Sequence, residues 1–176
     1  MTHANEDPGN IDLDIDIAVE VESTAPPELV WKVLWDLYRY SEWNPECVEA
    51  RWLDGASAPA AGTQFSGRNE WNGRTWTVTC HIVECAPPTF VRWTVEDPAF
   101  PSSTWSYSIT PTSTGCTIRE RFIHGPGNSG IRNMIRSNPD TPEVIIAART
   151  QMLNDNMLNG LRALAHLAEA APLESS

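Results

Sequence analysis

The chain has 176 residues, of which 41% are hydrophobic, as expected for a single soluble domain with a sizeable core. Its formal net charge is -11 and Lys32 is its only lysine, so DNA, RNA and anionic membranes would be repelled, and we exclude nucleic-acid binding. The first residues lack a signal-peptide pattern and no window approaches about 18 uninterrupted apolar residues, so we expect a cytoplasmic protein without membrane insertion.

The first ten residues have a composition typical of disorder. Between Ile15 and Val21, apolar and acidic residues then alternate, which is the period of a half-buried strand. Pro26 and Pro27 begin a helix whose apolar stripe extends to about Leu37. A second short helix or turn is expected at residues 38–42, ending before the next proline.

From residue 48 to residue 124 the chain is typical of consecutive strands separated by turn residues. Asn72 and Gly73 form a dipeptide that favours a tight hairpin. Trp105 and Tyr107 alternate with Ser106 and Ser108, which predicts one apolar and one polar face. The expected strands are 48–52, 65–71, 76–84, 90–96, 103–110 and 116–124.

The last long segment, from Pro142 to about Ala170, predicts one amphipathic helix. Thr141 can cap it with its hydroxyl group, and Pro142 suits a first helical position. At about 1.5 Å per residue this helix is about 43 Å long and needs a long partner surface, which only the strands can supply. The apolar stripe consists of Ile146, Thr150, Leu153, Met157, Leu161, Leu164 and Ala168.

This order of elements predicts an α+β fold: a curved seven-stranded antiparallel sheet wrapped around a long C-terminal helix, with two short helices after the first strand. We expect one domain at 11–171, preceded by a disordered terminus at 1–10 and followed by a tail at 172–176. The four cysteines, Cys47, Cys80, Cys85 and Cys116, form no CxxC pair, so we expect reduced thiols and neither a zinc site nor a disulfide framework.

The sequence resembles the START-like, or helix-grip, superfamily (SRPBCC-type), and within it the polyketide cyclase/dehydrase and lipid-transport branch. The resemblance rests on three segments: APPELVW at 25–31, YSEWNP at 40–45 and GPG at 125–127. It covers about residues 15–170 and implies a helix-grip fold with an apolar cavity between sheet and helix. Its members include aromatases and cyclases, lipid and hormone carriers, and co-chaperones, and it supplies no fixed catalytic motif.

Strand alternation predicts which side chains line this cavity. Trp31, Trp35, Trp43 and Trp52 are expected to pack at the margin between helix and sheet and not to line the cavity. Aromatic walls would suit a flat or polyene-like ligand. The expected substrate-binding residues are Asn69, Trp71, Trp76, Trp93, Trp105, Phe122, Leu153 and Met157.

Glu120, Tyr107 and His124 are the candidate catalytic residues, because they are polar groups in phase with apolar neighbours. We expect Glu120 opposite Trp105 with Tyr107 diagonal to it, close enough to share a ligand. A carboxyl among indoles should have a raised pKa, which suits proton transfer. The alternatives are a one-residue slip that turns Glu120 outward, a solvated His124, a structural Tyr107, and Asn69 on a hairpin rim.

Three other chemistries are rejected. Gly125, Gly127 and Gly130 fit GxGxxG, but no second parallel strand follows, so we interpret residues 125–140 as a flexible loop at the cavity entrance. Schiff-base catalysis needs a desolvated lysine, whereas Lys32 is expected on the solvent-facing side of its helix. Glu120 and His124 would lie about 13 Å apart along a strand, too far to share a metal ion. We expect no cofactor and no metal.

The leading hypothesis is a cofactor-independent cyclase or dehydratase-like enzyme of secondary metabolism that acts on a hydrophobic small molecule. Glu120 would transfer a proton, and Tyr107 with Asn69 or His124 would stabilise an enolate or a leaving hydroxyl group. The first alternative is a non-catalytic carrier or sensor of a hydrophobic ligand. The second is a co-chaperone-type interaction domain, which would show an exposed apolar patch.

Overall fold

The computed structural model describes residues 13–172, so the predicted disordered terminus at 1–10 and the last four residues of the predicted tail lie outside it. Within that range, none of the helices is long and apolar enough to cross a membrane. The elements in chain order are β1 (Asp16–Ser23), α1 (Pro27–Leu34), the 3-10 helix η1 (Leu37–Glu42), β2 (Cys47–Trp52), β3 (Gln64–Trp71), β4 (Arg74–Ala86), β5 (Phe90–Val95), β6 (Ser103–Thr112), β7 (Gly115–His124), α2 (Gly130–Ser137) and α3 (Pro142–Ala170).

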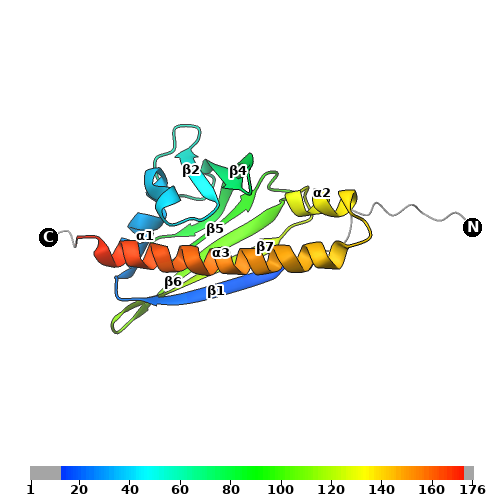
Figure 1. Ribbon diagram of the computed structural model, residues 1–176. Coiled ribbons are helices and arrows are strands. Elements are labelled where there is room, and N and C mark those ends of the chain that lie inside the picture. The colour runs from blue at the N-terminus through cyan, green and yellow to red at the C-terminus, as the bar shows by residue number, and fades with distance from the viewer. Residues whose placement is uncertain (1–12, 173–176) are drawn as a thin grey trace, which may run out of the picture.

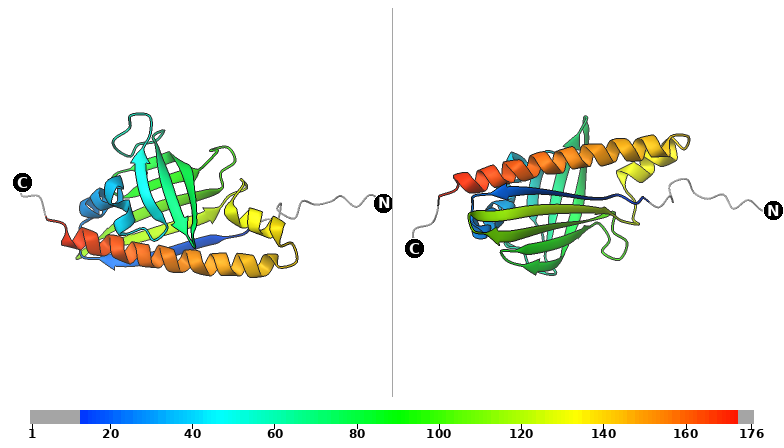
Figure 2. Two further views of the ribbon diagram at one scale, coloured as in Figure 1. Left: turned by 45° about the horizontal axis from the view of Figure 1, so that its top comes forward. Right: turned by 90° about the horizontal axis from the view of Figure 1, so that it is seen from below.

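The seven strands form one antiparallel sheet in the order β1-β7-β6-β5-β4-β3-β2. β1 crosses to the far edge and pairs with β7, while the other strands pair with their neighbours in sequence. The sheet curls, and α3 runs along its open side close to β1, with α1 and η1 at one end and α2 at the other (Figures 1 and 2). The predicted α+β helix-grip fold is confirmed.

The long helix begins and ends where its sequence pattern predicts, at Pro142 and Ala170. Thr141 is its N-cap residue, but the predicted capping by the hydroxyl group is wrong, since the side chain accepts no hydrogen bond. The Thr141 carbonyl group instead accepts from the N–H of Ile145 at 3.3 Å. The free N–H groups of the first turn therefore receive no side-chain acceptor from this residue.

Burial along α3 is uneven. Residues 142–152 include no fully buried side chain, and Val144 is 67% exposed. In the second half, Leu161, Leu164 and Ala168 are fully buried, and Glu169 accepts hydrogen bonds from Ser23 and Thr24 at the end of β1. The C-terminal half is therefore held firmly on the sheet, while the N-terminal half is held more loosely.

Residues 125–129 form an irregular segment, as the glycine pattern predicts, but the expected loop does not extend to residue 140, because residues 130–137 form α2. Ser129 caps this helix by accepting from the N–H of Arg132 at 3.3 Å, a pattern typical of a helix start. Gly125 and Gly127 precede it, and a Cβ atom at either position would collide with the backbone of Pro101 or Phe100. These two glycines therefore allow two loops to pack closely.

The predicted inward facing of Tyr107 and Glu120 is confirmed by their burial, but the register between β6 and β7 differs from the prediction. Glu120 pairs directly with Tyr107, and Trp105 pairs with Phe122 on one side and Trp93 on the other. The outward alternative for Glu120 is wrong, because its side chain is only 4% exposed. The β6–β7 turn is tighter than expected, with Thr112 paired to Gly115, which shifts every opposed pair.

Candidate functional site

A hydrogen-bonded carboxyl–phenol pair lies at the centre of the sheet's inner face. The Tyr107 hydroxyl group donates to Glu120 Oε1 at 2.6 Å, and both side chains are almost fully buried. The two residues are directly opposed on β6 and β7, so the distance follows from the spacing of paired strands.

Burial controls the protonation of this pair. Loss of solvent raises the pKa of Glu120 to about 8, and this effect exceeds the lowering caused by the hydrogen bond from Tyr107. Burial, together with the neighbouring Glu120, raises the pKa of Tyr107 well above its usual range. At neutral pH both groups hold their protons, and the Glu120 carboxyl is the one poised to release its proton near pH 8.

Aromatic side chains pack against Tyr107 and against one another in the core. Trp93 stacks on Tyr107 with ring centroids 5.6 Å apart and an interplanar angle of 12°. Trp35 meets Trp93 and Phe65 edge-on at 5.9 Å and 5.6 Å. Trp93, which we predicted to bind substrate, is therefore a core side chain that packs on Tyr107, and it is not among the residues that line the cavity beside Glu120.

The space in front of Glu120 is a small cavity of about 30 Å³ between the sheet, α3 and the segment that joins η1 to β2. Three of the predicted substrate-binding residues, Trp105, Leu153 and Met157, line it. Trp43 also lines it, although its sequence position favoured packing, and its indole N–H is buried without an acceptor among the described residues. The full lining is Trp43, Asn44, Pro45, Glu46, Trp105, Glu120, Leu153, Asn156, Met157 and Gly160.

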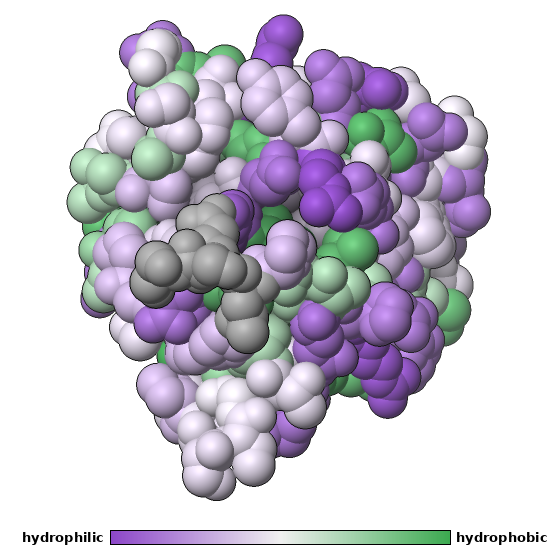
Figure 3. All heavy atoms as spheres, turned by 90° about the vertical axis from the view of Figure 1, so that its left-hand side faces the viewer, coloured by the Kyte–Doolittle hydropathy of each residue, from purple (hydrophilic) through white to green (hydrophobic). Residues whose placement is uncertain are grey.

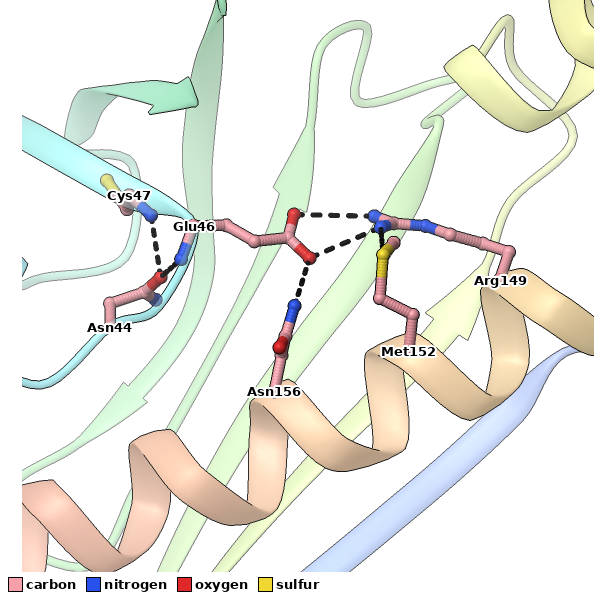
Figure 4. Close-up of polar contacts among 6 residues, drawn as sticks. All are labelled: Asn44, Glu46, Cys47, Arg149, Met152 and Asn156. Carbon is pink, nitrogen blue, oxygen red and sulfur yellow. Dashed lines mark hydrogen bonds and ion pairs between the residues drawn. The ribbon is translucent and has the colours of Figure 1, made fainter. Parts of the chain in front are cut away.

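Residues 43–46, which we call the strap, line this cavity opposite α3. The Glu46 side chain reaches from the strap to Asn156 and Arg149 of the helix (Figure 4). The Glu46 carboxylate accepts from Asn156 Nδ2 at 2.9 Å and pairs with Arg149 at 3.2 Å. A Cβ atom at Gly160 would lie 3.1 Å from Pro45, so the missing side chain lets the strap approach the helix. Asn44 shapes the strap by accepting from the N–H groups of Glu46 and Cys47, at 3.0 Å and 2.8 Å.

The structure does not bring His124 to Glu120. His124 is half-buried at the end of β7, where its Nε2 lies 3.0 Å from the hydroxyl oxygen of Ser129. Phe122 contacts the His124 ring edge-on, with ring centroids 6.3 Å apart, and neither residue is among those that line the cavity beside Glu120. Burial and the nearby Arg132 lower the pKa of His124, so the ring is neutral at pH 7.

The other predicted residues lie at the end of the β3–β4 hairpin. Asn69 pairs with Trp76 across the two strands, and Trp71 pairs with Arg74. Trp76 is 38% exposed, and neither Asn69 nor the two tryptophans line the cavity beside Glu120. Their role in ligand binding stays a prediction, and it would require a ligand that extends along the hairpin.

Arg149, Asn156 and Gly160 were missed by the sequence reasoning, although a signal was present. They lie four residues before, three after and seven after Leu153, which places them on the face of the predicted apolar stripe. Polar or missing side chains within an apolar stripe indicate contact with something other than the core. Trp43 to Glu46 fall in the YSEWNP segment and the residue after it, where only the resemblance drew attention.

Comparison with known proteins agrees with this architecture. Residues 14–165 match the family described as polyketide cyclase / dehydrase and lipid transport. The chain belongs to this family. A search of curated proteins finds no match to it. The predicted resemblance to the polyketide cyclase/dehydrase branch is confirmed.

Solved structures of the same fold have low sequence identity. The polyketide-cyclase-like protein from Corynebacterium glutamicum is 24% identical, with a TM-score of 0.67 and coverage of 91% of this chain and 94% of that chain. The di-domain ARO/CYC StfQ of the steffimycin biosynthetic pathway is 16% identical, with a TM-score of 0.71 and coverage of 90% and 52%. The chain thus spans about half of that di-domain protein. At these identities the likeness shows the fold of the polyketide cyclase/dehydrase family.

Proposed function

We propose that this member of the polyketide cyclase/dehydrase family is a cofactor-independent enzyme that moves protons on a hydrophobic small molecule, as a cyclase or dehydratase does. The observation that carries the proposal is the buried Glu120 carboxyl group, held by Tyr107 at 2.6 Å and facing a cavity. A buried acid with a pKa of about 8 can both give and take a proton near neutral pH. The family match and the ARO/CYC neighbour support the same class of reaction.

In a dehydration, the Glu120 carboxyl group gives its proton to a hydroxyl group of the substrate, the C–O bond breaks and water departs. The resulting carboxylate takes a proton from the neighbouring carbon, so a C=C bond forms and Glu120 returns to its starting state. Tyr107 donates to the carboxyl throughout and stabilises the carboxylate while it exists. The aromatic wall of Trp43 and Trp105 positions a flat substrate against this group.

The test uses a β-hydroxy ketone carried on a naphthalene ring, whose dehydration produces a conjugated enone with its own absorbance. We expect turnover by the wild-type protein and a loss of at least about a hundredfold in Glu120→Gln, with probe affinity changed much less. Glu49→Gln, in an exposed ion pair with Arg68, is the matched control and should retain full activity. Equal activity of the Glu120 variant would contradict the proposal.

A carrier or sensor role needs the same cavity without a proton donor. Under that reading the probe binds and returns unchanged, and Glu120→Gln alters only affinity. The co-chaperone reading has less support: on the face that carries α1 and the C-terminal end of α3, hydrophobic side chains lie scattered between polar ones (Figure 3). Native mass spectrometry identifies any compound that is bound to the purified protein, and this compound is then incubated with fresh protein. A chemically changed product indicates an enzyme, whereas an unchanged compound indicates a carrier.

A further inference from the structure

The cavity beside Glu120 has a polar mouth as well as an aromatic wall. A volume of about 30 Å³ corresponds to about one water molecule, so a ring system reaches Glu120 only when the strap and α3 separate. The groups at this boundary are the side chains of Glu46 from the strap and Asn156 from α3, which both line the cavity. They are joined by a hydrogen bond (Figure 4). A ligand that enters there passes directly against these two side chains.

The hydrogen bonds at the mouth leave acceptor atoms for a ligand. A carboxylate only accepts, so the Asn156 amide must turn its NH₂ group to Glu46, and its Oδ1 faces away. Glu46 Oε1 receives two donors, from Asn156 at 2.9 Å and Arg149 at 3.2 Å, whereas Oε2 receives one long contact of 3.5 Å from Arg149. Each carboxylate oxygen has two lone pairs, so Oε2 can accept a further, shorter bond.

The donors at the mouth are only partly engaged. Arg149 directs its guanidinium group to both oxygens of Glu46 and to the Met152 sulfur at 3.9 Å, and the Asn156 NH₂ group is bound to Glu46. These contacts use one of the two Asn156 N–H bonds and three of the five of Arg149. The Trp43 indole N–H inside the cavity has no acceptor among the described residues. The Glu46 side chain is only 14% exposed, which makes an unshared lone pair there more costly than on the surface. The Glu46 carboxylate therefore offers a ligand an acceptor and no donor.

We propose that Glu46 and Asn156 determine the specificity of this cavity by accepting hydrogen bonds from a hydroxyl group on a flat, uncharged ligand. This inference rests on the proposed function in taking the Glu120 cavity as the ligand site. A methyl ether of the same skeleton has no proton to give. A carboxylate ligand meets the negative charge of Glu46 on a chain whose net charge is already -11.

The test compares three naphthalene probes by calorimetry: β-naphthol, β-methoxynaphthalene and β-naphthoate. We expect wild-type protein to bind the naphthol about tenfold or more tightly than the methyl ether, because a hydrogen bond to a charged acceptor is strong, and the naphthoate most weakly. Glu46→Gln can turn an N–H toward the ligand, so the preference for the naphthol over the ether should fall to about threefold or less. Asn156→Leu should also reduce it, whereas Glu49→Gln should leave it unchanged.

Two results would overturn the inference: equal binding of the three probes by the wild-type protein, or an undiminished preference for the naphthol in both variants. Thermal unfolding of each variant confirms that it is folded at the temperature of the titration. If β-methoxynaphthalene still binds and Glu120→Gln still stops the dehydration, the proposed function stands while this inference fails. If none of these probes binds and the β-hydroxy ketone is not dehydrated, both fail together.

Discussion

The carboxyl group of Glu120 shares its cavity with Trp105 and Met157 and has Tyr107 as its hydrogen-bond donor. One neutral donor compensates only part of the cost of a buried negative charge, so the folded protein favours the protonated acid. In the unfolded chain the same group ionises near its ordinary value of 4.5, whereas in the folded protein it does so at about 8. Unfolding between these values therefore releases a proton.

From this difference we predict that the free energy of unfolding falls as pH rises from 4.5 to 8, with Glu120 contributing up to about 1.4 kcal/mol per pH unit. The stabilisation is complete below pH 4.5 and is lost as pH passes 8. Glu120→Gln should remove this part of the slope. Urea unfolding of wild type, Glu120→Gln and Glu49→Gln across this range measures it, and parallel curves for wild type and Glu120→Gln would contradict it.

The strap and α3 are joined by contacts between residues more than a hundred positions apart in the chain. The Glu46–Arg149 ion pair and the Glu46–Asn156 hydrogen bond lie at one side of the cavity, and the close approach at Gly160 lies further along the helix. The backbone carbonyl of Glu46 also accepts from the N–H of Glu70 in β3 at 2.8 Å, so the strap is tied to the sheet as well. Opening the mouth therefore requires breaking the side-chain contacts to α3.

We accordingly predict that Glu46→Gln admits a ligand faster. Loss of the partly buried ion pair should raise the association rate of β-methoxynaphthalene roughly three- to tenfold, since this probe gives no hydrogen bond to the mouth. Stopped-flow quenching of tryptophan fluorescence measures the rate. The exposed pair of Glu49 and Arg68 provides the control, and Glu49→Gln should not change the rate. An unchanged rate in Glu46→Gln would show that the strap does not limit access.

At the scale of the whole molecule, the C-terminal end of α3 is held firmly on the sheet and its N-terminal end is held loosely. Its C-terminal half is buried against the sheet and tied by Glu169 to the end of β1, whereas residues 142–152 have no fully buried side chain. The cavity lies beside the middle of the helix, from Leu153 to Gly160. The helix can therefore move at its N-terminal end without disturbing the main core.

This gradient predicts amide hydrogen exchange along α3. Amides at 147–152 should exchange at least about tenfold faster than those at 160–168, because opening the N-terminal half exposes little apolar surface. Mass spectrometry of peptic fragments after deuterium labelling measures the difference. Uniform protection along the helix would mean that it opens as one unit, and access to Glu120 would then depend on the strap alone.

The sequence by itself determined the elements whose signals are local. Pro142, the absence of a further proline before Pro172 and the helical period defined α3, and strand alternation placed Glu120 and Tyr107 on the inner face. These features depend only on residues that are close in the sequence, so they can be predicted without knowing the fold. The order of these elements then predicted the curved sheet around the long helix, and the resemblance to a known family implied the same fold.

Only the tertiary structure decided which residues meet. Register depends on the exact turn between β6 and β7, and a change of two residues replaced Trp105 by Tyr107 as the partner of Glu120. The cavity is the small space left after Trp35, Trp93 and other large side chains have packed, and strand alternation does not reveal how much of the interior they fill. The Glu46–Arg149 pair spans 103 positions, so no local pattern predicts it.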